Sequence, residues 1–127
     1  MEYFILSKLI FFNDFCSEQN KNIVAVTDLT DEEFDKAIRE SEKVVVKYYA
    51  GWCGTCRLLA PKFKRLSEEE QFADVVFLDV NAEHNPHARN IAGVSNLPFI
   101  ATFKEGKILE ATPAAKIEKV RELVERL

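Results

Sequence analysis

Two cysteines separated by two residues, Cys53 and Cys56, carry the most evident chemistry in this sequence. A pair at this spacing can close a small disulfide, and after reduction one thiolate can attack a foreign disulfide while the other thiol releases the product. The pair follows Lys43–Tyr49, a β-branched and aromatic run that is typical of a buried strand. A helix that starts at the cysteines would place Cys53 at its N-terminus, where the helix dipole stabilises a thiolate. We therefore expect Cys53 to be the nucleophile and Cys56 the resolving thiol.

Other kinds of site have less support in the sequence. A zinc site needs about four ligands, and nothing pairs His84 and His87 with the cysteines. We interpret these histidines as polar residues on a short surface helix. The four glycines form no phosphate-binding loop, and no Ser/His/Asp catalytic set is evident. The sequence therefore predicts no metal and no cofactor beyond the redox-active disulfide Cys53–Cys56.

Length and charge limit the remaining classes of protein. The chain has 127 residues and a net charge of −4, which fits one domain and provides no basic surface for nucleic acid. No continuous apolar run approaches the roughly 18 residues that a membrane span needs. The odd number of cysteines, three, argues against a secreted disulfide framework. We therefore expect a cytoplasmic protein whose thiols are kept reduced.

The first 22 residues are predicted to be an apolar extension that precedes a domain over residues 23–127. Glu2, Ser7 and Lys8 interrupt the apolar pattern, which argues against a cleaved export signal. We favour an additional helix or arm that packs on the domain; an exported or membrane-associated protein is the alternative. The cysteine of this segment, Cys16, is interpreted as a buried or accidental thiol and not as a third redox partner.

Periodicity and turn residues predict the remaining elements. Thr30 and Glu33 match a capping box at the start of a helix, and Pro61 predicts a kink in the helix that follows the cysteines. The expected elements are a strand at Ile23–Val26, a helix from Thr30, a strand at Lys43–Tyr49, a helix from the cysteines to about Glu70, a strand at Val75–Val80, a helix from Asn85–Pro86 to about Ala92, strands at Phe99–Phe103 and Lys107–Ala111, and a final helix capped by Thr112–Pro113. This β-α-β-α-β-α-β-β-α order is that of an α/β protein with a mixed sheet covered on both faces.

The cysteine segment resembles a known family. Trp52-Cys53-Gly54-Thr55-Cys56, followed by Ala60-Pro61, is similar to the thioredoxin active-site sequence WCGPC…AP, and Asn85-Pro86 and 93–98 are similar to later segments of that family. The resemblance covers about Ile23–Leu127. It implies the thioredoxin fold, with a central mixed five-stranded sheet flanked by four helices, and thiol–disulfide exchange with protein substrates. It also implies thioredoxin reductase as the electron donor.

The resemblance implies further site residues. Pro98 would be cis and would face the disulfide, and the Leu97 backbone would pair with an extended substrate strand. Trp52, Leu97 and Pro98 would form an apolar rim around Cys53, and Gly54 and Thr55 would lie between the cysteines at the substrate surface. Monomer or weak dimer are both compatible with such a domain.

Three departures from the family pattern stand out. Thr55 replaces the usual proline, which frees an N–H and a hydroxyl near the thiolate, so we expect a more oxidising disulfide. Lys47 stands where the family has a buried aspartate, and Asp79 where it has a lysine. We hypothesise that Lys47 and Asp79 form a buried pair that takes part in proton transfer to Cys56. The segment Glu110–Pro113 lacks the family glycine after the last strand, which predicts an altered substrate surface.

These observations favour a reductase of protein disulfides. An oxidase or isomerase of an oxidising compartment is the second reading; it would need an export signal, which the N-terminus resembles only faintly. An interaction module that works without its thiols is a third possibility, which the intact Cys53/Cys56 pair argues against.

Overall fold

The computed structural model describes residues 26–127, which form a sheet covered by helices. The predicted extension over 1–22 and Cys16 lie outside the described residues. The elements are β1 (Val26–Leu29), α2 (Asp31–Glu40), β2 (Lys43–Tyr49), α3 (Gly54–Ser67), the 3₁₀ turn η1 (Glu70–Phe72), β3 (Val76–Asn81), α4 (Pro86–Ala92), β4 (Phe99–Lys104), β5 (Lys107–Pro113) and α5 (Ile117–Glu125).

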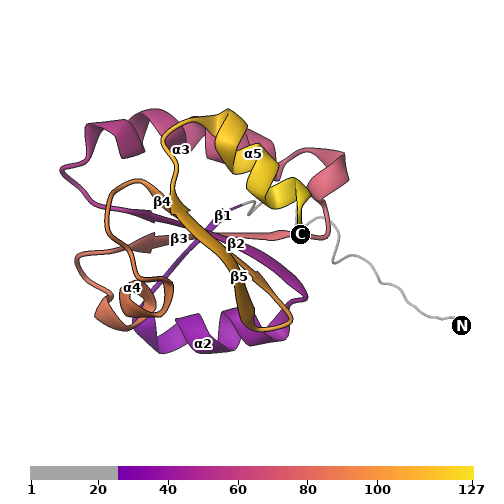
Figure 1. Cartoon of the computed structure of the whole chain (residues 1–127), viewed down its shortest axis with the longest axis horizontal. Helices are drawn as coiled ribbons and strands as arrows, with labels where there is room; N and C mark the ends of the chain where they lie inside the picture. Colours follow the sequence, from indigo (N-terminus) through magenta and orange to yellow (C-terminus); the bar gives the residue numbers. More distant parts are fainter. Residues whose placement is uncertain (1–25) are drawn as a thin grey trace, which may run out of the picture.

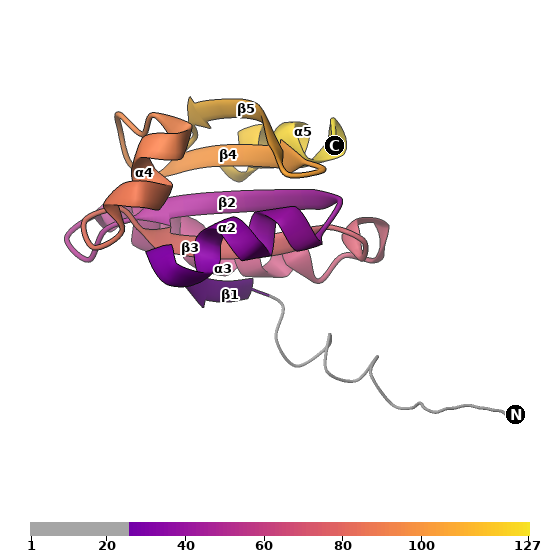
Figure 2. The same ribbon diagram turned by 90° about the horizontal axis from the view of Figure 1, so that it is seen from below.

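The five strands form one mixed sheet with the order β1-β3-β2-β4-β5. Strands β1, β3 and β2 run parallel to one another, whereas β4 and β5 are antiparallel to their neighbours. Helices α2 and α4 cover one face of the sheet and α3 and α5 the other, as Figures 1 and 2 show. This is the architecture that the order of predicted elements indicated. None of the helices within residues 26–127 is long and apolar enough to cross a membrane.

The residues of β2 alternate between two cores because successive side chains of a strand point to opposite faces. Val44 and Tyr48 pack on the face of α2 and α4, where the Tyr48 hydroxyl donates a hydrogen bond to the Ala88 carbonyl at 2.9 Å. Val45 packs with Phe63 on the face of α3 and α5. Both faces of β2 are therefore buried, which explains its near-continuous apolar sequence.

Several predicted boundaries are wrong. Strand β1 extends to Leu29, and α3 ends at Ser67, before the expected Glu70. The largest error is at the C-terminus, where Thr112 and Pro113 end β5 and do not cap the last helix. The partner strand explains this difference: Thr112 pairs with Ile100 and Pro113 with Phe99, so sheet pairing continues through residues whose local sequence is typical of a helix start.

The predicted capping box at the start of α2 is also wrong. Thr30 occupies the N-cap position, but its side chain makes no capping hydrogen bond. Instead, the Asn85 side chain accepts a hydrogen bond from the Asp31 backbone N–H at 2.8 Å. Asp31 in turn accepts bonds from the backbone N–H groups of His87 and Ala88 at 3.0 and 2.9 Å. The starts of α2 and α4, far apart in the sequence, thus cap each other.

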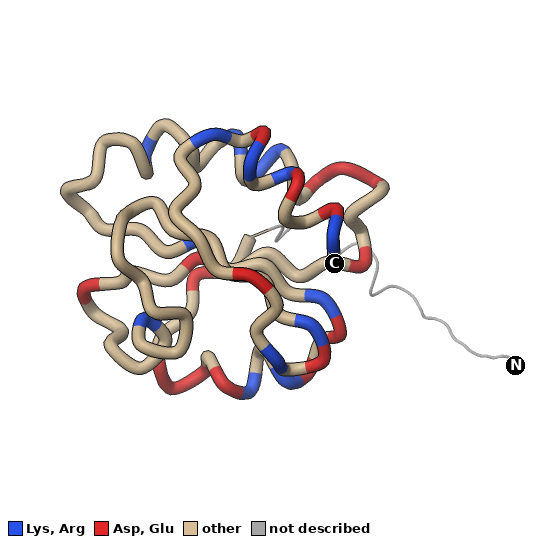
Figure 3. Tube along the Cα trace, viewed as in Figure 1, with Lys and Arg blue, Asp and Glu red and all other residues tan. Residues whose placement is uncertain are grey.

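Charged residues are distributed differently over the helices (Figure 3). The first turn of α2 is acidic, the charged residues of α3 are all Lys or Arg, and α5 carries residues of both signs. Glu69, just after α3, accepts two hydrogen bonds from Arg121 of α5 at 2.9 and 2.6 Å. These bonds lower the pKa of Glu69 to about 2. The hydrogen bonds between Arg121 and Glu69 thus connect the segment after α3 to the last helix.

Replacing Asp31 by alanine is expected to lower the free energy of unfolding by about 1–2 kcal/mol, because two N–H groups of the first turn of α4 lose their acceptor. Urea denaturation measures the loss. Glu32→Ala, which removes an exposed neighbouring carboxylate, is the control and should change stability by less than about 0.5 kcal/mol. Equal effects of the two substitutions would contradict the capping role of Asp31.

Candidate active site

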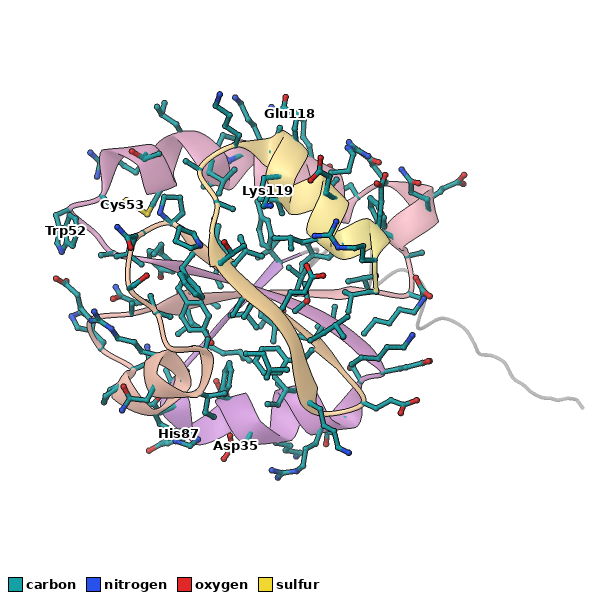
Figure 4. The ribbon with its side chains drawn as sticks, viewed as in Figure 1. Asp35, Trp52, Cys53, His87, Glu118 and Lys119 are labelled. Atoms are coloured by element: carbon teal, nitrogen blue, oxygen red, sulfur yellow. A yellow bond between two sulfur atoms is a disulfide. The ribbon has the colours of Figure 1, made fainter. Side chains whose placement is uncertain are left out.

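The cysteine pair lies at the point where β2 leads into α3. Cys53 is the N-cap of α3, and its sulfur accepts a hydrogen bond from the backbone N–H of Cys56 at 3.1 Å. The two cysteines are joined by a disulfide, with their Cα atoms 5.3 Å apart. Figure 4 shows Cys53 at one end of the molecule, just inside Trp52. The sulfur of Cys53 therefore sits where free N–H groups and the positive end of the helix dipole favour an anion.

Both cysteines are buried. Cys53 is 5% exposed and Cys56 3%, so exposure alone barely distinguishes them. Ala50 packs with both cysteines, and Tyr49 and Leu97 lie against this cluster. The difference between the two thiols comes from position: Cys53 precedes the helix, whereas Cys56 lies within its first turn.

The residues expected to form a rim around Cys53 differ in how exposed they are. Trp52 is 67% exposed, and its indole N–H donates a hydrogen bond to the Glu83 carboxylate. Gly54 and Thr55 are exposed, Leu97 is half-buried against the cysteine cluster, and Pro98 is buried behind a cis peptide bond. Glu83 could not be identified from the sequence. It contacts Trp52 from a different loop, and no local sequence pattern predicts that contact.

The comparison with known families agrees with this geometry. The sequence model of the family described as Thioredoxin matches residues 25–126, which is most of the chain and includes both cysteines. The chain belongs to the thioredoxin family. It is accordingly a thiol–disulfide oxidoreductase, and the cysteine pair at the start of α3 is the feature that this activity requires.

Individual thioredoxins support the assignment. The chain is 40% identical over 90 residues to thioredoxin-1 of Saccharomyces cerevisiae, covering 68% of this chain and 85% of that protein. It is 32% identical over 104 residues to the chloroplastic thioredoxin F of Oryza sativa subsp. japonica, covering 79% of this chain and only 54% of that protein. Among solved structures, the short form of spinach chloroplast thioredoxin F superposes with a TM-score of 0.73 at 27% identity, covering 80% of this chain and 91% of that one. Thioredoxin of Schistosoma mansoni gives the same TM-score and identity, covering 80% and 94%.

Lys47 and Asp79 meet on the face of the sheet beneath α3. They are register partners on β2 and β3, and Lys47 Nζ lies 3.4 Å from Asp79 Oδ1. The Lys47 side chain is 3% exposed and the Asp79 side chain 25%. The two groups attract as charges but are not aligned for a hydrogen bond, so Asp79 Oδ1 has no hydrogen-bond partner among the described residues. Burial raises the pKa of Asp79 above its ordinary value, and the charge of Lys47 opposes that rise.

The pair lies under the helix that carries Cys56. Lys47 Nζ is 5.0 Å from the centre of the Phe63 ring, within cation–π range. Cys56 and Phe63 are both buried on the inner side of α3, and seven residues of helix separate them by roughly 10 Å. Tyr49, two residues beyond Lys47 on the same face of β2, packs against the cysteine cluster. It connects the charged pair with the disulfide.

A second carboxylate extends this charged row to the edge of the sheet. Asp28 on β1 is the register partner of Asp79 and accepts a hydrogen bond from the Tyr49 hydroxyl at 3.0 Å. Burial, this hydrogen bond and the two carboxylates together raise the pKa of Tyr49 to about 12. Asp28 and Tyr49 also line a pocket of 530 Å³ beside the start of α2. Asp28 could not be identified from the sequence, because only the sheet register brings it next to Asp79.

Removing one member of the Lys47–Asp79 pair should lower the free energy of unfolding by more than removing both members does. Lys47→Met is expected to lower the free energy of unfolding by about 3 kcal/mol, because it leaves Asp79 without a countercharge. The double variant Lys47→Met/Asp79→Leu should recover most of that loss. Urea denaturation of the single and double variants measures both values, and additive losses would show that the two side chains do not interact.

Proposed function

We propose that this protein reduces disulfides in other proteins, with Cys53 as the attacking thiolate and Cys56 as the resolving thiol. The observation that carries the proposal is the position of Cys53 at the N-cap of α3, where the Cys56 N–H contacts its sulfur. Attack by Cys53 forms a mixed disulfide and expels one substrate thiolate. Cys56 then attacks the Cys53 sulfur, which releases the second substrate thiolate and leaves Cys53–Cys56 oxidised.

We infer that the substrate docks on the exposed rim around Cys53. Trp52, Gly54 and Thr55 offer a surface on one side of the disulfide, and Leu97 with cis-Pro98 borders the other. An extended substrate strand would hydrogen-bond to the Leu97 backbone, which makes recognition tolerant of sequence. Ala114, which directly follows β5, donates its backbone N–H to the Pro98 carbonyl at 3.0 Å and so supports this border.

We further propose that Asp79, held by Lys47, exchanges the proton that Cys56 loses and gains during the cycle. Asp79 Oδ1, which is ion-paired with Lys47 but accepts no hydrogen bond from the described residues, and the raised pKa of this carboxyl suit a group that accepts and returns a proton. Asp79 makes no hydrogen bond to Cys56 among the described residues, so water would have to carry the proton between them.

The partners and the setting are proposed from the family. Disulfide-containing proteins would be the substrates and thioredoxin reductase the electron donor, in a thiol-reducing compartment such as the cytoplasm. The domain would act as a monomer or weak dimer. A domain over residues 23–127, preceded by an apolar extension over 1–22, fits the start of the family match at residue 25.

Thr55 favours a second candidate, a more oxidising enzyme that forms or rearranges disulfides. Unlike the proline usual at this position, Thr55 retains a backbone N–H and a hydroxyl near the Cys53 sulfur. The redox potential, measured against glutathione, separates the two: a value near that of strong cellular reductants supports the reductase, and a value near that of oxidases supports the alternative. If the protein instead acted as an interaction module without thiol chemistry, a variant that lacks both cysteines would keep its function.

Substituting the cysteines tests the cycle directly. Cys53→Ser should abolish reduction of insulin disulfides, because the attacking sulfur is gone. Cys56→Ser should allow attack without release and accumulate mixed disulfides, which non-reducing electrophoresis detects. Cys16→Ser is the control and should retain activity. Mixed disulfides that form through Cys56 in the Cys53→Ser variant would reverse the assigned roles.

The proton role of Asp79 predicts a change in the pH profile. The carboxylate can accept a proton only above its raised pKa, so the rate of mixed-disulfide resolution should fall as the pH drops through that value. Asp79→Asn should remove this ionisation and slow resolution on the high-pH side by up to about 100-fold. Asp28→Asn, which changes the neighbouring exposed carboxylate, is the control. An unchanged pH profile in Asp79→Asn would end the proposal.

A further inference from the structure

The pocket beside the start of α2 lies at the same end of the sheet as the disulfide. Its walls come from the ends of the parallel strands β1, β2 and β3 and from the start of α2. Tyr49, at the end of β2, lines the pocket and also packs against the cysteine cluster. Asn81 and His84 line it from the loop after β3, and Glu83 of the same loop accepts the hydrogen bond of the Trp52 indole. The pocket is therefore continuous with the rim around the disulfide.

The lining of this pocket is acidic. It contains the carboxylates of Asp28, Asp31 and Glu32, one histidine, and neither Lys nor Arg. Figure 3 shows the acidic first turn of α2, which forms one wall. The volume of 530 Å³ lies within the range of ordinary ligand sites and leaves room for the end of a long side chain. The occupant that this lining complements is a cationic group.

The three carboxylates have no countercharge within residues 26–127. Asp31 accepts two hydrogen bonds from backbone N–H groups at the start of α4, which fix its position. Asp28 accepts a hydrogen bond from the neutral Tyr49 hydroxyl, and Glu32 is exposed. None of the ion pairs among the described residues includes any of the three. A cation from outside this part of the chain would therefore meet unneutralised negative charge in the pocket.

The order of the strands determines how a bound substrate would reach the pocket. Leu97 precedes β4, whereas the pocket lies toward β3 and β1, so the two are on opposite sides of the end of β2. Neighbouring strands are about 4.8 Å apart, which places β1 about 10 Å from β2. An extended segment advances about 3.3 Å per residue. A substrate that pairs with Leu97 and passes over Cys53 would thus bring roughly the third or fourth residue from its own cysteine to the pocket.

We propose that this pocket binds a lysine or arginine side chain of the substrate protein. Disulfides with a basic residue about three or four positions from the attacked cysteine would then be preferred. The inference rests on the exchange cycle proposed above and specifies the class of substrate that the cycle favours. Asp28 and Glu32 bind the cationic group, and Asp31 adds its charge. The pocket affects how the substrate docks before attack, whereas the later attack by Cys56 takes place within the mixed disulfide and does not depend on it.

The test uses two synthetic peptides, each with a single cysteine joined by a disulfide to thionitrobenzoate. One peptide has lysine at the third and fourth positions on both sides of the cysteine, and the other has glutamine there. The reduced Cys16→Ser chain is used, so that Cys53 and Cys56 supply all the thiols. The absorbance of released thionitrobenzoate gives the second-order rate constant of attack. The lysine peptide should react about two- to tenfold faster, as expected for a cation beside exposed carboxylates.

Substitutions in the first turn of α2 assign this preference to the pocket. Glu32→Gln should reduce it about twofold, and Glu32→Lys should abolish or reverse it, because a positive charge then lines the pocket. Glu33→Gln and Glu33→Lys are the matched controls, since Glu33 is also exposed but does not line the pocket. Both should keep most of the preference. The glutamine peptide should react equally with all variants, which would show that the cysteine pair is intact.

Equal rates for the two peptides, or equal losses of preference in the Glu32 and Glu33 variants, would overturn the role of the pocket. The outcome is separable from the exchange cycle. If neither peptide reacted with the reduced chain, the proposed function would fail, whereas reaction of both peptides at the same rate would refute this inference alone.

Discussion

The pairing and the burial of the central strand β2 determine how the rest of the structure is arranged around it. It pairs with β3 on one side and β4 on the other, and both of its faces are buried. A shift of one residue would turn each apolar face toward the wrong helix layer, so the register is strongly specified. Tyr48 pairs with Phe99, which brings the start of β4 beside the end of β2. Leu97 and the cysteine turn, far apart in sequence, therefore meet at the same end of the sheet.

The same register explains how a lysine can lie in a buried strand. At Lys47 the neighbouring strand supplies Asp79, and the helix above supplies the Phe63 ring. An isolated ammonium would be costly at this depth, whereas a facing carboxylate offsets much of that cost. The segment that carries the two cysteines therefore has the start of α3 on one side. On the side of the sheet it has a row of charged groups that ends at Asp28. The electrostatics of the site come from several elements and not from the cysteine motif alone.

Polar contacts between loops complete the active-site end. Asp31 and Asn85 join the starts of α2 and α4, and Glu83, which follows β3, holds the indole of Trp52. On the other side, Arg57 holds the Gly51 carbonyl. The turn that presents Cys53 is therefore fixed by side chains from both sides, which holds the cysteine pair in one geometry.

The element order, the family and the reactive pair follow from the sequence alone, because hydrophobic periodicity and the spacing of Cys53 and Cys56 are local properties. The sequence also placed Lys47 and Asp79 on adjacent strands. The ends of elements and the caps were decided by tertiary structure: pairing with β4 kept Thr112 in a strand, and Asn85 took over the cap expected of Thr30. Glu83 and Asp28 became site residues only in the fold, since their partners lie on other elements or loops. The sequence shows which chemical groups are present, whereas the packing of the fold determines which of them lie next to one another.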